Sequence, residues 1–221
     1  MLTKAVALFY KDFQSELRTR YAVNSLVMFI LVAVSVILFS IGNEKVTPGL
    51  TAGLYWVTVF FASMSGLSRV FVSEEDRGTS LTLQLLASPS TILTGKLLFN
   101  LVLIFLIDFF ITILFFIFFS SFVLLNFALF IVVFIFSNFG LAVSSTIIAS
   151  IIAKTSSRGS LYSVLSFPII LPLLIESVQL TLNAINGASF GDSRVELLII
   201  GCYDVVMITA SYMLFDLIWK E

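Results

Sequence analysis

Few residues in this chain have side chains that could carry out chemistry, and histidine is missing altogether. The sequence contains no histidine and a single cysteine, Cys202, which lies within an apolar segment. The usual general base, the commonest zinc ligand and the usual haem ligand are therefore absent. No phosphate-binding loop of the GxxxxGK(S/T) type occurs either, so the chain is not expected to hydrolyse ATP by that mechanism. These absences argue against an enzyme, and the sequence predicts neither a catalytic site nor a metal site.

The longest polar interruption of the chain lies between residues 69 and 96. A charged cluster there is followed by a helix-breaking glycine, by leucines at helical spacing and by a proline that ends the pattern. Such a segment stays outside lipid, and a short helix between two spans can act as a lever for a soluble partner. The alternative is an ordinary solvated loop, since charge runs are usually solvated. The residues proposed for the contact are Glu74, Glu75, Asp76, Gly78, Leu81, Leu85 and Pro89.

Three carboxylic acids, Asp108, Glu176 and Asp204, lie inside apolar segments long enough to span a membrane. A carboxylate at bilayer depth costs about 2.5–3.5 kcal/mol on insertion scales, so such residues usually face a cavity, a partner helix or a functional path. One interpretation is therefore a polar lining of a translocation route or an inter-subunit contact. The other is that each acid is protonated, or bonded to a neighbouring Ser, Thr or Asn, and serves packing only.

Two prolines four residues apart, Pro168 and Pro172, lie in the fifth apolar segment. Each removes a backbone donor, so the pair is expected to bend or break the helix. In transporters, broken helices line cavities or act as hinges, whereas a static kink is simply accommodated by neighbouring helices. Both interpretations remain open on the sequence alone.

The composition predicts an all-α integral membrane protein. Of the 221 residues, 59% are hydrophobic and 11% are charged, and the mean hydropathy is +1.12. Soluble domains carry about 25% charged residues, so a membrane protein is the only class that fits. The basic residues form no stripe of the kind that binds nucleic acid, and no nucleic-acid partner is expected.

The apolar segments predict six transmembrane helices, preceded by one amphipathic helix. Residues 1–22 place apolar side chains three and four apart with charges between them, which suits a helix lying on the cytoplasmic membrane surface. The following domain, residues 23–221, contains the six spans and a cytoplasmic loop at 73–96. The first span has 19 residues without a charge, enough to cross a hydrocarbon core of about 30 Å. The spans cover about residues 23–41, 50–72, 97–119, 127–152, 161–180 and 197–219.

The distribution of lysine and arginine predicts the orientation of these spans. With six spans, ten of the twelve basic residues lie on one side, and only Lys45 and Arg194 lie on the other. Basic residues accumulate in cytoplasmic loops. Both termini and the loop at 73–96 are therefore expected to be cytoplasmic.

The order of these elements resembles the membrane subunit of an ABC-2-type exporter, and more narrowly the CcmB family, haem exporter protein B of the cytochrome c maturation system. The resemblance covers essentially the whole chain. It rests on the chain length, on the pattern FxxEExxGxxLxxxLxxxP that begins at Phe71 and is followed by Lys96, and on the run SFPIILPLL that begins at Ser166. The double-proline run is what points to CcmB rather than to other ABC-2 permeases.

The resemblance implies a permease of the bacterial cytoplasmic membrane that pairs with a separate ATPase, CcmA, and acts with CcmC and the haem chaperone CcmE. ATP hydrolysis would be linked to release of the haem-loaded chaperone. Haem would be a handled substrate, since Cys202 and Met207 are weak ligands at best. A coupling helix at about residues 79–88 would dock its leucines in a groove of the ATPase. The acidic residues that would meet basic side chains at the rim are Glu74, Glu75 and Asp76.

Several alternatives remain open on the sequence alone. A permease that exports a polysaccharide, lipid or peptide would share the architecture. A membrane scaffold without a transport role would also fit, and a membrane enzyme is less favoured because histidine is absent. An ATPase dimer with two coupling sites suggests two membrane subunits, either a homodimer of this chain or one copy with a related partner.

Overall fold

The computed structural model describes residues 2–19, 21–42, 44, 46–67, 70–71, 74, 78–153 and 158–220. Among these residues, six helices are long and apolar enough to cross a membrane, which confirms the predicted fold class. A helix at each predicted position bears out the expected order of elements. The long helices are α2 (Tyr21–Ile41), α3 (Pro48–Leu67), α6 (Pro89–Phe118), α7 (Phe127–Ala153), α8 (Arg158–Asn186) and α9 (Arg194–Lys220). The shorter ones are α1 (Leu2–Thr19) and α5 (Ser80–Leu86).

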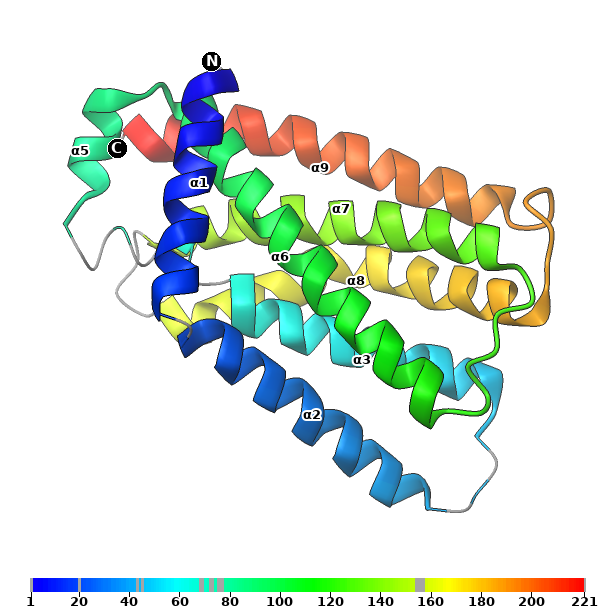
Figure 1. The fold of residues 1–221 in the computed structure, drawn as a ribbon. Helices are drawn as coiled ribbons and strands as arrows, with labels where there is room; N and C mark the ends of the chain where they lie inside the picture. The colour runs from blue at the N-terminus through cyan, green and yellow to red at the C-terminus, as the bar shows by residue number, and fades with distance from the viewer. Residues whose placement is uncertain are drawn as a thin grey trace.

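The long helices form a bundle with α7 at its centre (Figure 1). Helix α7 packs against α6, α8 and α9, and α3 packs against α6 and α8. The second half of α7 is almost completely buried and rich in small residues, among them Ser144, Ser145 and Ser150. Small side chains allow neighbouring helices to approach closely in a membrane, where lipid removes the usual hydrophobic driving force. Helix α2 lies at the edge of the bundle (Figure 1) and packs mainly on α3.

The third span begins earlier than the sequence suggested. Helix α6 starts at Pro89 rather than near residue 97, so the segment between α3 and α6 is shorter than 73–96. Proline is favoured at the first position of a helix, where its missing N–H would have had no partner. Pro89 therefore begins α6, in addition to ending the pattern of the preceding leucines. Lys96 consequently lies inside α6 and not at a loop edge.

Helix α8 runs unbroken through Pro168 and Pro172, so of the two expected effects, a bend or a break, the break does not occur. Neighbouring helices can support the backbone next to a proline in a membrane. Here the Tyr203 hydroxyl of α9 donates a hydrogen bond to the carbonyl oxygen of Ile169, between the two prolines, at 3.1 Å.

Buried side-chain hydrogen bonds connect the central helices. The Trp56 indole of α3 donates to Thr181 of α8 at 2.8 Å, and the Asn100 amide of α6 donates to Thr146 of α7 at the same distance. Ser137 of α7 and Ser177 of α8 share a hydrogen bond of 2.7 Å. Such bonds contribute about 0.6–1.7 kcal/mol each between membrane helices, so together they favour one register of the bundle.

The N-terminal amphipathic helix α1 packs on the start of α6. At their crossing, a Cβ atom on Gly95 would come within 2.9 Å of the Leu8 Cβ and 3.0 Å of the Ala5 carbonyl oxygen. Ala5 is itself buried. The apolar face of α1 is therefore partly covered by protein and is not available in full to the membrane surface.

Replacing Gly95 by valine is expected to push α1 away from α6. Overpacking a close contact typically costs about 1–3 kcal/mol. The thermal unfolding temperature in detergent should fall, and limited proteolysis should cleave α1 faster than in the wild type. Gly53→Ala is the control, because a Cβ on Gly53 would meet nothing within 4 Å. An unchanged unfolding temperature and a protected α1 in the valine variant would show that this crossing is looser than described.

Replacing Tyr55 by phenylalanine is expected to destabilise the bundle, because the Tyr55 hydroxyl donates to the buried Asp108 carboxylate at 2.5 Å. Loss of one partner of a buried polar group costs about 1–3 kcal/mol. Thermal unfolding in detergent measures the effect. Tyr10→Phe serves as the control, since Tyr10 is exposed on α1. Equal unfolding temperatures for the two variants would contradict the prediction.

Candidate functional site

The segment between α3 and α6 contains the short helix that the sequence predicted at about residues 79–88. The chain turns at Gly78 with a φ of 64°, a left-handed conformation that glycine adopts without strain, and α5 follows directly. Within α5, Leu83 is buried, whereas Leu85 is 89% exposed and Leu86 is 66% exposed. The helix thus presents two neighbouring leucines to its surroundings. The side chain of Leu81 lies outside the described part of the structure.

A shallow pocket of about 510 Å³ borders these exposed leucines. It is lined by residues 85–89 together with Lys4 of α1 and Thr91 of α6. The Lys4 ammonium donates to the carbonyl oxygen of Leu86 at 3.3 Å, so α1 supports the end of α5. An apolar side chain from a soluble partner could enter here between α5 and the start of α6.

Four charged residues join α1, the segment before α5, and α6; we call them the ion cluster. They are Lys11 and Asp12 of α1, Glu74, and Lys96 of α6. The Lys96 ammonium lies 2.9 Å from both the Glu74 and the Asp12 carboxylates, and the Lys11 ammonium lies 2.5 Å from Glu74. The Thr79 hydroxyl donates to the other oxygen of Glu74 at 2.5 Å. The ion cluster therefore connects the three elements that surround α5.

In this buried environment, the charge states of Glu74 and Lys11 depend on their partners in the ion cluster. The Lys96 side chain is 1% exposed, and Glu74 is 5% exposed. Burial alone would raise the pKa of Glu74, but the nearby Lys96 charge and the hydrogen bonds from Lys11, Thr79 and Lys96 together lower it to about 2. The pKa of Lys11 is raised, although partial burial opposes this, because Glu74 and Asp12 stabilise its charge. Glu74 is thus ionised throughout the physiological pH range.

The ion cluster revises the sequence-based interpretation of the acidic run. Glu74 was expected at an exposed rim, but the structure places it inside, paired within the chain. Glu75 and Asp76 lie outside the described residues. Lys11, Asp12 and Lys96 were not selected from the sequence, because a lysine near a span resembles an ordinary boundary residue. One signal in the sequence could have revealed the position of Lys96. Proline is favoured at the first position of a helix, and a helix that starts at Pro89 includes Lys96.

Within the membrane-spanning part, Asp108 and Asp204 lie in different surroundings. Asp108 is fully enclosed, and it accepts hydrogen bonds from Tyr55 of α3 and, at 2.6 Å, from the Asn138 amide of α7. Asp108 therefore fits the packing interpretation and joins α3, α6 and α7. Asp204 is 4% exposed, and neither of its carboxylate oxygens has a hydrogen-bond partner among the described residues.

The other intramembrane residues selected from the sequence lie on α8. Pro168 and Pro172 are both exposed on its surface, and Glu176 is partly exposed. Glu176 lies near Glu196 of α9, close enough for the two charges to interact. No hydrogen bond between described residues connects Glu176 to Asp108 or to Asp204, so the described part of the structure does not gather the three acids into one polar path.

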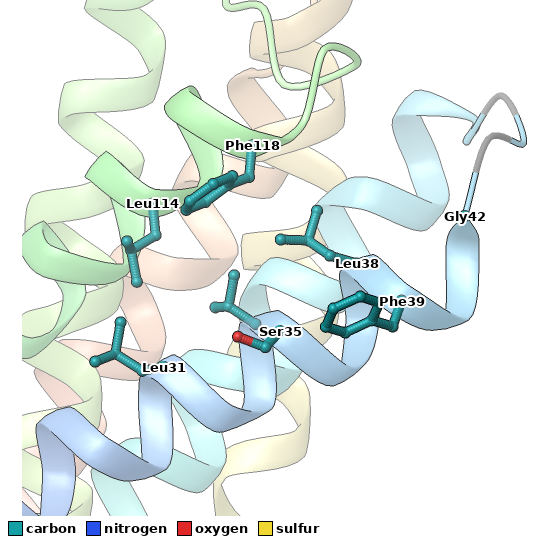
Figure 2. Close-up of a pocket in the computed structure, with 8 residues that line it drawn as sticks. Leu31, Ser35, Leu38, Phe39, Gly42, Leu114 and Phe118 are labelled. Atoms are coloured by element: carbon teal, nitrogen blue, oxygen red, sulfur yellow. The ribbon is translucent and has the colours of Figure 1, made fainter.

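An apolar groove of about 510 Å³ opens between α2 and the end of α6 (Figure 2). Leu31, Leu38 and Phe39 of α2 face Leu114 and Phe118 of α6 across it. Ser35 supplies the one polar side chain among the described residues that line it. Such a lining suits hydrocarbon, and the described lining residues include no histidine, cysteine or methionine that could bind haem iron.

Protonation of Glu74 should weaken the attachment of α1 and α5. Because its folded pKa is lowered from 4.5 to about 2, the stabilisation is complete above pH 4.5 and is lost as the pH falls toward 2. Glu74→Gln should therefore lower the unfolding temperature at neutral pH, with a loss of about 1.5–3 kcal/mol, typical of hydrogen bonds to charged groups. The difference from wild type should shrink below pH 4.5. Glu44→Gln, at an exposed position, is the control. A difference that is constant with pH would contradict the assignment.

Comparison with known proteins agrees with the resemblance seen in the sequence. A family model described as CcmB protein matches residues 3–215. No curated protein sequence gives a significant match. The match covers α1, the segment with α5, and nearly all of the six long apolar helices. The chain therefore belongs to the CcmB family, the membrane-embedded permease subunits of ABC-type haem exporters in cytochrome c maturation.

Proposed function

We propose that this permease couples ATP hydrolysis by a partner ATPase to haem delivery in cytochrome c maturation, through release of a haem-loaded chaperone. The observation that carries the proposal is the exposed pair Leu85 and Leu86 on α5. Helix α5 lies between two membrane-spanning helices and is held in place by α1 and the ion cluster. ATP is bound and hydrolysed in a CcmA-like subunit, and haem is a substrate rather than a cofactor of this chain.

The exposed leucines of α5 are suited to bind a groove in the ATPase. Aliphatic side chains that project from a short helix contribute most of their affinity when a partner encloses them completely. In the free subunit, Leu85 and Leu86 leave their apolar surface in water, at a cost of about 25 cal/mol for each Å². Docking of the ATPase removes that cost. Glu75 and Asp76, which adjoin α5 in the sequence, remain candidates for contacts at the rim of the groove.

The ion cluster gives a route by which movement of α5 reaches the membrane. Glu74 binds Thr79 at the start of α5 on one side and Lys96 on the other. Lys96 belongs to α6, which continues across the membrane without interruption to Phe118. When the ATPase dimer closes and displaces α5, Glu74 and Lys96 therefore transmit the displacement to α6. Helix α1 follows through Lys11 and Asp12.

The proposed orientation places α5 and both termini in the cytoplasm of a bacterial cell, with the helices in the inner membrane. The two ends of the chain and α5 lie together at one end of the bundle (Figure 1). Ten of the twelve basic residues fall on the same side, which favours the cytoplasm. A soluble ATPase can then reach α5 and α1 at once.

Partner membrane components complete the proposed complex. CcmC-like and CcmE-like proteins would provide the histidine ligands for haem iron that this chain lacks. An ATPase dimer has two sites for coupling helices. The second site would be filled by another copy of this chain in a homodimer or by a related membrane subunit.

The test replaces the exposed leucines in the full complex, purified from native membranes. Leu85→Asp and Leu86→Asp should each weaken association with the ATPase by about tenfold or more, because truncating a central interface residue costs above about 1–2 kcal/mol. Leu85→Met keeps the apolar contact and is the matched control. Quantitative mass spectrometry measures how much ATPase is recovered with the tagged protein.

A second measurement separates coupling from a scaffold role. In the Leu85→Asp strain, the membrane partners should still co-purify, while mature cytochrome c should fall with the bound ATPase. A scaffold without transport function predicts normal maturation after the ATPase is lost. Full ATPase recovery with Leu85→Asp and Leu86→Asp would refute the assignment of α5.

A further inference from the structure

The pocket beside the exposed leucines of α5 includes a positively charged side chain. Lys4 of α1 is the one charged residue among the described residues that line it. Lys4 is exposed, so a partner that enters the pocket can reach its ammonium. The ammonium donates to the Leu86 carbonyl oxygen at 3.3 Å, but a neutral carbonyl takes one of its three donors and does not balance its charge. The pocket therefore favours an anionic group.

The nearby carboxylates of the ion cluster do not offset the charge of Lys4. Within the cluster, Lys11 and Lys96 are paired with Asp12 and Glu74, so the four charges balance one another. Lys11 follows Lys4 by two turns of α1, which is about 10 Å along the helix axis. Among the described residues, the charge at the pocket is therefore positive.

The rest of the pocket wall is partly apolar and partly hydroxyl-bearing. Leu85 and Leu86 supply exposed apolar surface at the end of α5. Ser88 and Thr91, at the start of α6, supply hydroxyl groups. A hydroxyl donates or accepts as its neighbour requires, so these two groups can turn toward an anion. The pocket thus suits an occupant that combines a carboxylate with an apolar side chain.

The position of the pocket indicates which protein fills it. Helix α5 and the N-terminal part of α1 lie together at one end of the bundle (Figure 1). A soluble protein that binds Leu85 and Leu86 also covers the pocket, because both leucines form part of its wall. We propose that the ATPase places an aspartate or glutamate in this pocket, where the carboxylate pairs with Lys4 while a neighbouring apolar side chain packs on the two leucines. This inference rests on the proposed coupling at α5.

The contact reverses the charge relation expected from the sequence. In that expectation, acidic residues of this chain, Glu75 and Asp76 among them, meet basic side chains of the ATPase. At the Leu86 end of α5, the base belongs to this chain and the acid belongs to the partner. A charge pair at the edge of an apolar contact acts mainly on the association rate and on the register of the two surfaces. Lys4 therefore fixes how the ATPase segment lies along α5.

The first test uses the complete complex purified from native membranes and treated with a water-soluble carbodiimide. This reagent joins an amine and a carboxylate that are in contact through an amide bond. Mass spectrometry should find Lys4 joined to an aspartate or glutamate of the ATPase. Lys4→Arg is the matched control, because arginine keeps the positive charge but has no amine. This variant should recover as much ATPase as the wild type and lack the adduct.

The second test measures how much ATPase is recovered with tagged variants. Lys4→Gln should lower the recovery by about three- to tenfold, between the effects of an exposed and of an enclosed ion pair. Lys4→Glu should lower it by more than about tenfold, because like charges repel across an interface. Arg18→Gln removes another exposed positive charge from α1, far from the pocket, and should leave the recovery unchanged.

Salt separates a charge contact from a loosened α5. The difference between wild type and Lys4→Gln should shrink at 1 M salt, where charges are screened beyond about 3 Å. Loss of the hydrogen bond to Leu86 would instead lower the recovery equally at low and high salt. A difference that does not depend on salt would therefore overturn the proposal. So would a Lys4 adduct found only within this chain or only with lipid, or no such adduct in a complex that contains the ATPase.

Leu85→Asp distinguishes failure of this inference from failure of the coupling role. If Leu85→Asp lowers the recovery of the ATPase but Lys4→Gln and Lys4→Glu do not, the ATPase docks on α5 without a carboxylate at Lys4, and this inference alone is wrong. If none of the three variants lowers it, α5 is not the docking helix and both proposals are wrong.

Discussion

The ion pair between Glu74 and Lys96 is the interaction on which the arrangement outside the membrane depends. Lys96 is almost completely enclosed, and a buried ammonium without a counter-charge would be strongly destabilising. Glu74 and Asp12 meet this requirement from two separate parts of the chain. The charge on α6 thus brings α1 and the segment before α5 to the same place. The pair of Glu74 and Lys96, together with the Lys4 contact to Leu86, thus holds α5 against α1 and α6.

Inside the membrane the governing constraint is hydrogen bonding rather than ion pairing. Asp108 accepts two hydrogen bonds from other helices, whereas neither oxygen of Asp204 has a hydrogen-bond partner among the described residues. Asp108 therefore joins three helices of the bundle, whereas Asp204 is enclosed beside Gly140 of α7. Because lipid provides neither water nor donors, a carboxylate at this depth depends on the side chains that surround it.

Much of the architecture could be predicted because hydropathy and helical spacing are local properties. The order of apolar and polar residues predicts the six spans, the amphipathic α1 and the short helix α5. The start of α6 was missed because Pro89 both ends one pattern and begins the next helix. The continuity of α8 past Pro168 and the burial of Glu74 could not be predicted, since both depend on partners distant in sequence.

The central place of α7 has a consequence for how the protein is made. During synthesis, α2, α3 and α6 enter the membrane before the helix that most of the bundle packs against. Until α7 arrives, Asn100 and Asp108 on α6 lack the side chains of Thr146 and Asn138 that bind them. Polar residues without partners are held poorly by lipid. These two polar side chains of α6 therefore gain their partners on α7 only when the fourth span has followed the third into the membrane.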